Sequence, residues 1–262
     1  METQIRTLAF GTCRIEEPLE ILSKIGCTGH LKFPHHLHYP SQIFQTIKDY
    51  DSESYIPENL LYLISEGAIK DISSRNKTTE NLAAERESFK NLSRKYDKFI
   101  IEVSGMHELI YKDEMYVEYF AKADILKFKE QLEPLYKDGE IQEIYPDDIF
   151  KRDVSDEHMI KVTGEICSYL DYKPILWVSH FDVLAPQKVR ENRRRSISLL
   201  RKCAKINKNQ FFDPTNVIMH LGQASALKDN GKDIAHFTKE SVNILSEVYK
   251  SWIEQGSHAW IE

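Results

Sequence analysis

Four short apolar runs, separated by segments with helical spacing, constrain the fold of this chain most strongly. The runs are "RTLAFG" (6–11), "KFIIEVSG" (98–105), "PILWVSH" (174–180) and the weaker "QFFDPT" (210–215). Each run is stopped by small or polar residues, which is typical of buried parallel strands. Helix-like segments lie between or after them, at 41–48, 80–95, 187–207 and 239–254. This alternation predicts an α/β fold, a three-layer sandwich around a mostly parallel sheet.

The domain organisation follows from length and from one segment of unusual composition. With 262 residues, the chain can form one large α/β domain over 1–262. Residues 111–170 are polar and rich in aromatic side chains, and they are too many for an ordinary crossover. We therefore expect a helical insertion there. It either closes over an active site as a lid or buries one edge of the sheet.

Composition excludes several classes of function. The net charge of −6 gives no electrostatic case for binding nucleic acid or an anionic membrane surface. No apolar run approaches the about 18 residues of a membrane span, and the N-terminal residues lack the pattern of a signal peptide. The four cysteines form no CxxC pair and no evident disulfide framework. We therefore expect a cytoplasmic protein in which Cys13 stays a thiol.

Reactive side chains follow the predicted strands, and ligands of open parallel sheets bind at the carboxyl ends of the strands. The first strand is followed by Thr12, Cys13 and Arg14, the second by Ser104 and Gly105, and the third by His180. The segment "GKDIAHFT" after the last strand brings Asp233 and His236 at a spacing of three.

Cys13 is a candidate nucleophile, with His236 as its base and Asp233 as the group that orients the imidazole. A thiol is mostly protonated at neutral pH, so it needs a base or a local positive charge to act. Asp233 can hold one ring nitrogen while the other faces the thiol, as in hydrolase triads. Arg14 and the amides of a helix that begins after Gly11 would further favour the thiolate. The alternative is that Cys13 is a small buried hydrophobe, Asp233 a helix cap and His236 a surface residue.

The order of these blocks resembles that of the SGNH (GDSL-type) hydrolase superfamily. In "FGTCR", Cys13 stands where that family has its nucleophilic serine, and "DIAHF" is similar to the family's C-terminal Asp-x-x-His. This sequence departs from the family pattern in two ways. Thr12 replaces the Asp of Gly-Asp-Ser, and the Gly-x-Asn-Asp that contributes to the family's oxyanion hole is missing. If such a hole exists, the Cys13 amide is one donor and Ser104 or the Gly105 amide another.

A narrower resemblance is to WcbI-type acetyltransferases of bacterial capsule loci, which use coenzyme A. It rests on the "GTCR" start and on "DKFIIEVS". It implies acyl transfer from a thioester to a sugar hydroxyl in surface-polysaccharide biosynthesis, with no required cofactor and with coenzyme A or acyl-CoA as co-substrate. The alternatives are an esterase or thioesterase, and a non-catalytic binding module on the same scaffold. We expect a small-molecule or carbohydrate substrate. The oligomeric state stays open.

Two further groups of residues are weighed as ligand contacts. The histidine-rich loop "GHLKFPHHLHYP" matches no zinc spacing, so we expect it to be surface or to face substrate, with His38 as the candidate contact. In "RENRRRSISLLRKCAK", Arg193 and Arg194 are candidate phosphate contacts for a coenzyme. The simpler interpretation of that run is the solvated face of an amphipathic helix.

Overall fold

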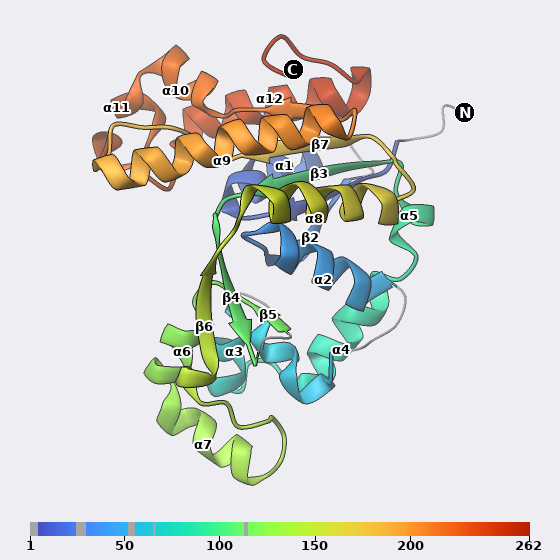
Figure 1. Cartoon of the computed structure of the whole chain (residues 1–262), viewed down its shortest axis with the longest axis vertical. Coiled ribbons are helices and arrows are strands. Elements are labelled where there is room, and N and C mark those ends of the chain that lie inside the picture. The colour runs from blue at the N-terminus through green and yellow to red at the C-terminus, as the bar shows by residue number, and fades with distance from the viewer. Residues whose placement is uncertain (1–4, 25–29, 52–55, 65–66, 113–114) are drawn as a thin grey trace. The chain divides into compact units, whose positions relative to one another are not determined.

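The computed structural model describes residues 5–24, 30–51, 56–64, 67–112 and 115–262 (Figure 1). Cys27 and Gly29 lie outside the described residues, and the rest of the histidine-rich segment is not simply a loop, because His30–His36 form strand β2. The chain forms two compact units. The first comprises Met1–Phe33, Ser93–Met106 and Asp156–Glu262, and the second Pro34–Leu92 and His107–Ser155. Each unit is described by itself.

A five-stranded sheet, in the order β2-β1-β3-β7-β8, organises the first unit. The strands are β1 (Thr7–Gly11), β2 (His30–His36), β3 (Lys98–Val103), β7 (Ile175–Ser179) and β8 (Gln210–Phe212). The pairs β1–β3, β3–β7 and β7–β8 are all parallel. All four predicted strands are therefore confirmed, and their order is that of a doubly wound, flavodoxin-like sheet whose switch point lies between β1 and β3.

Helices cover both faces of this sheet, which confirms the predicted three-layer α/β architecture (Figure 1). One face is covered by α1 (Cys13–Lys24) and α12 (Lys239–Gln255), whose apolar side chains pack in one core with Ala9, Ile100 and Leu176. The other face is covered by α8 (Asp156–Tyr169) and α9 (Gln187–Ile206). Short helices α10 (Thr215–Leu221), α11 (Gln223–Ala226) and η3 (Asp229–Gly231) follow β8, while α5 (Leu92–Lys95) precedes β3.

The second unit has its own antiparallel sheet, in the order β5-β4-β6. Its strands are β4 (His107–Tyr111), β5 (Met115–Val117) and β6 (Ile149–Asp153). Its helices are α2 (Pro40–Asp51), η1 (Glu58–Leu63), α3 (Ala68–Ser73), α4 (Thr79–Ser88), α6 (Ala121–Lys127), α7 (Lys129–Lys137) and η2 (Pro146–Asp148).

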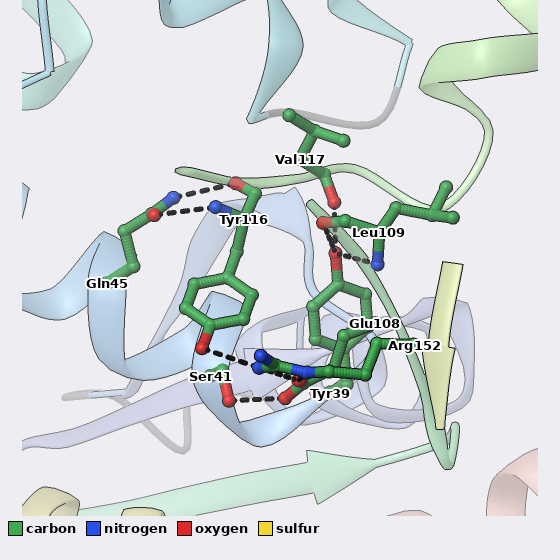
Figure 2. Close-up of polar contacts among 8 residues, drawn as sticks. All are labelled: Tyr39, Ser41, Gln45, Glu108, Leu109, Tyr116, Val117 and Arg152. Carbon is green, nitrogen blue, oxygen red and sulfur yellow. Dashed lines mark hydrogen bonds and ion pairs between the residues drawn. The ribbon is translucent and has the colours of Figure 1, made fainter. Parts of the chain in front are cut away.

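Buried polar side chains join α2 to this small sheet (Figure 2). The Gln45 amide donates to the Tyr116 carbonyl (2.7 Å) and accepts from the Tyr116 amide (2.8 Å), so it pairs with β5 as a neighbouring strand would. Glu108 accepts from Ser41 and, at 2.7 Å, from Nη2 of Arg152. These bonds satisfy groups that would otherwise be buried without partners.

The segment 111–170 differs from the expected helical insertion. It contains β5 and β6 as well as α6 and α7, and its last part, Asp156–Tyr169, is helix α8 of the first unit. Strands of three to five residues are too short to show a clear alternation of apolar and polar side chains, so the sequence pattern did not predict them. Among the described residues, none of the helices has the length and apolarity that crossing a membrane requires.

Candidate functional site

Cys13 lies at the point where β1 gives way to α1. The Thr12 carbonyl accepts from the amides of Ile15 (2.9 Å) and Glu16 (3.1 Å), so the helix begins with Cys13 as its first residue. The Cys13 side chain is half-buried. A thiol at a helix N-terminus lies in the positive end of the helix dipole, which favours its thiolate form.

Asp233 and His236 form a hydrogen-bonded pair in the loop before α12. Asp233 Oδ2 lies 2.8 Å from Nδ1 of His236, and Asp233 Oδ1 accepts from the amides of Ala235 (3.0 Å) and His236 (3.2 Å). Burial is the largest single effect and opposes ionisation, but these amide donors and the imidazole together outweigh it and lower the pKa of Asp233. With Nδ1 facing the carboxylate, Nε2 is the ring nitrogen that can take a proton from another group.

The two halves of this constellation meet at one hollow of the first unit. Residues from α1, from the end of the Asp233–His236 loop and from α12 line it together: Cys13, Arg14, Glu17, His236, Phe237 and Val242. Cys13 and His236 are more than two hundred residues apart in the chain. The side chain of His236 is 46% exposed, so solvent reaches its imidazole.

Glu102 also belongs to this region, although its place inside an apolar run does not by itself predict a role there. It lies on β3, is fully buried, and bonds to Thr12 and to Arg14, the residues on either side of Cys13. Arg14 in turn contacts Nε2 of His180 at 3.1 Å, and His180 is itself buried. The signal that could have revealed Glu102 is a charged residue inside the apolar run "KFIIEVSG".

Ser104 and Gly105 follow β3 at the same edge of the sheet as Cys13. β3 pairs in parallel with β1, with Phe10 opposite Ile101, so the residues after both strands emerge side by side. Both Ser104 and Gly105 are half-buried. Their assignment as oxyanion donors stays a prediction.

Arg193 and Arg194 have different surroundings on α9. Arg193 donates to the carbonyls of Ile234 (2.9 Å) and Phe181 (3.4 Å), and its guanidinium lies over the Phe181 ring. Burial, and then the charge of Arg14, lower the pKa of Arg193 to about 10. Arg194 pairs with Asp182 at 2.7 Å. Arg193 thus ties the Asp233–His236 loop to the end of β7, whereas Arg194 is an exposed cation; a phosphate contact by either stays a prediction.

His38 belongs to the second unit. Its ring lies 5.1 Å from that of Tyr119 and 6.2 Å from that of Phe120, and both of these aromatic side chains are exposed. The part of the chain that the structure describes contains no cluster of His, Cys, Asp and Glu that could hold a metal ion.

Comparison with known proteins gives two partial matches. Residues 145–250, less than half of the chain, match the family model TviD_N, described as the TviD N-terminal domain. Among solved structures, a tryptophan-to-isoleucine mutant of Axe2, an acetyl-xylooligosaccharide esterase from Geobacillus Stearmophilus, is similar over 68% of both chains, at 14% identity and a TM-score of 0.36. No sequence among the curated proteins matches this chain.

Proposed function

We propose that this protein is an acyltransferase that carries the acyl group on Cys13 and passes it to a sugar hydroxyl. The observation that supports this most directly is that Cys13 and His236 line the same hollow while Asp233 holds the far nitrogen of the imidazole. That arrangement has the elements of an activated thiol: a helix N-terminus, a base and a group that orients the base.

The first half of the reaction loads the enzyme. The Cys13 thiolate attacks the carbonyl carbon of a thioester such as acetyl-CoA, a new C–S bond forms to Cys13, and the bond to the coenzyme sulfur breaks. The departing thiolate takes the proton that His236 received from Cys13. The Cys13 amide and a donor from Ser104 or Gly105 would bind the transient oxyanion.

The second half transfers the acyl group. His236 accepts the proton of the acceptor hydroxyl through Nε2, and the hydroxyl oxygen attacks the acyl-cysteine carbonyl. The C–S bond to Cys13 breaks, the ester forms and the thiolate is restored. The carbohydrate acceptor is supported by the resemblance of "GTCR" and "DKFIIEVS" to capsule acetyltransferases.

Incubation with acetyl-CoA followed by peptide mass spectrometry tests the proposal. We expect a gain of one acetyl group on the Cys13 peptide, no label in Cys13→Ala, and loss of acyl transfer in that variant. Cys167 and Cys203 serve as internal controls, because burial raises the pKa of Cys167 to about 11 and also raises that of Cys203. Full activity in Cys13→Ala would overturn the proposal.

Hydrolysis of an acyl group is the second candidate, favoured by the 46% exposure of the His236 side chain. Water could then replace the sugar as the acceptor. Release of coenzyme A from acetyl-CoA, measured with and without oligosaccharide, separates the two. We expect transfer to make release depend on the acceptor, whereas a hydrolase releases coenzyme A at the same rate without it.

A further inference from the structure

Glu102 divides its two carboxylate oxygens between the neighbours of Cys13. Oε2 accepts from the amide and from the hydroxyl of Thr12, both at 2.8 Å. Oε1 accepts from Nε of Arg14 at 2.5 Å. One carboxylate from β3 therefore fixes the residue before Cys13 and the residue after it. Charge-assisted bonds of this kind are stronger than those between neutral groups.

The chain leaves room for this carboxylate at Gly11. A Cβ atom at that position would lie 2.7 Å from Cβ of Glu102 and 2.8 Å from its Oε2. Such distances are too short for any ordinary contact, so β1 can approach Glu102 only where it has no side chain. The glycine that precedes the catalytic segment is thus explained by a residue on another strand.

The opposite end of Arg14 is also held. Its Nη1 lies 3.1 Å from Nε2 of His180, and its guanidinium lies 5.9 Å from the centre of the Phe181 ring. From α12, Tyr249 packs close enough for the charges of both Glu102 and Arg14 to act on its phenol, although burial is the main cause of its raised pKa. The pair is therefore enclosed on the α1 and α12 side of the sheet, away from water.

We infer that Glu102 is a positioning residue, which holds the first turn of α1 so that the Cys13 thiol faces His236. It acts through Thr12 and Arg14 and not by contact with substrate. The inference deepens the proposed function and rests on it, because positioning has a consequence for turnover only if Cys13 is the nucleophile.

Glu102 affects both the acidity of the Cys13 thiol and its position, and these two effects make the inference testable. Its negative charge disfavours a thiolate at Cys13. It also neutralises the positive charge of Arg14, and that positive charge by itself would favour the thiolate. Loss of that charge should therefore make the Cys13 thiolate form at lower pH. A glutamine at this position keeps one accepting oxygen, so it loses the bonds either to Thr12 or to Arg14. That loss should at the same time misplace the thiol and slow turnover.

The first experiment compares wild type with Glu102→Gln, which keeps the size of the side chain. We expect the pH midpoint of Cys13 alkylation by iodoacetamide, followed by peptide mass spectrometry, to fall by about one pH unit. We expect kcat for acyl transfer per folded molecule to fall between about 10- and 100-fold. A purely structural role would lower the folded fraction and leave both quantities unchanged, which would overturn the inference.

Glu108→Gln is the matched control for the alkylation measurement. Glu108 is likewise fully buried, and it bonds to Arg152 in the second unit. We expect this variant to keep the wild-type midpoint of Cys13 alkylation. An equal shift in both variants would show that any buried glutamate acts in the same way, and would overturn the specific role of Glu102.

A second pair of variants covers the case in which Glu102→Gln does not fold. Thr12→Ser keeps the hydroxyl that donates to Glu102, whereas Thr12→Val keeps the shape and removes the donor. We expect kcat near wild type for Thr12→Ser and a fall of about tenfold for Thr12→Val. Equal rates in the two variants would contradict the inference. If neither variant nor wild type transfers acyl groups, the proposed function fails, while the alkylation midpoints still report on Glu102.

Discussion

The role of Thr12 depends on Glu102, which lies ninety positions away in the chain. It stands where the SGNH pattern has an aspartate, and both its amide and its hydroxyl donate to Glu102. The acidic group next to Cys13 therefore comes from β3 and not from the loop itself. This arrangement leaves the Thr12 carbonyl to accept the first bonds of α1, which begins at Cys13.

Asp233→Asn should lower the rate of acyl transfer by between about 10²- and 10⁴-fold. An asparagine amide can donate to Nδ1 of His236, which places the ring proton on Nε2 and removes the base. The rate with acetyl-CoA under saturation measures the effect. A rate within about twofold of wild type would contradict the role of Asp233 as the orienting group.

The same carboxylate predicts a pH dependence of stability. Because the pKa of Asp233 is lowered in the folded protein, its ionised form is bound more favourably than in the unfolded chain. That contribution is complete above the ordinary carboxyl pKa of about 3.9 and is lost as the pH falls through the lower folded-state value. Thermal unfolding of wild type and Asp233→Asn should therefore converge as the pH falls below about 4. A difference that persists at the lowest pH would contradict this.

At the scale of elements, the close approach of β1 and β3 decides which residues can end β1. We expect Gly11→Ala to destabilise the protein by about 1–3 kcal/mol, because the new methyl group would overlap Glu102. Gly164→Ala in the middle of α8 should instead stabilise it by roughly 0.5–1 kcal/mol, since the nearest atom to its Cβ is 3.7 Å away. Urea denaturation measures both. The same sign in the two variants would contradict the packing argument.

Helix α9 supports the loop that carries Asp233 and His236 through one of its arginines. Arg193→Lys keeps the charge but cannot reach both carbonyls, so we expect a cost of about 1–3 kcal/mol and slower acyl transfer. Arg194→Lys changes an exposed pair with Asp182 and should cost less than about 0.5 kcal/mol. Denaturation and kcat measure both. A higher KM for acyl-CoA in Arg194→Gln would support the predicted phosphate contact.

At the scale of the whole molecule, each compact unit contains a buried glutamate that bonds to an arginine of the same unit. In the first unit the pair is Glu102 and Arg14. In the second unit this glutamate is Glu108, bonded to Arg152 across β4 and β6. We expect Glu108→Gln to cost about 1–3 kcal/mol locally, because the partners of the carboxylate are left poorly satisfied. Hydrogen exchange should become faster in β4 and β6 and stay unchanged in β1 and β3. Faster exchange in β1 alone would contradict this.

The sequence was sufficient for the parts of the fold that rest on strong local patterns. The four apolar runs contain strands β1, β3, β7 and β8, and the segment 187–207 contains α9, which ends at Ile206. It was not sufficient for β4, β5 and β6, which have three to five residues each and are held by pairing with one another, and in β5 also by Gln45. Short strands carry little periodic signal, so only pairing defines them.

The candidate site divides in the same way. The types and order of residues in "FGTCR" and "DIAHF" were enough to single out Cys13, Asp233 and His236, because a thiol, an imidazole and a carboxylate suit that chemistry wherever they meet. Only the tertiary structure could show that residues of both segments line one hollow. It also shows that Glu102 bonds to both Thr12 and Arg14. Hydrogen bonds between distant strands depend on which strands become neighbours. The order of residues along the chain does not specify which strands become neighbours, whereas the packing of the sheet does.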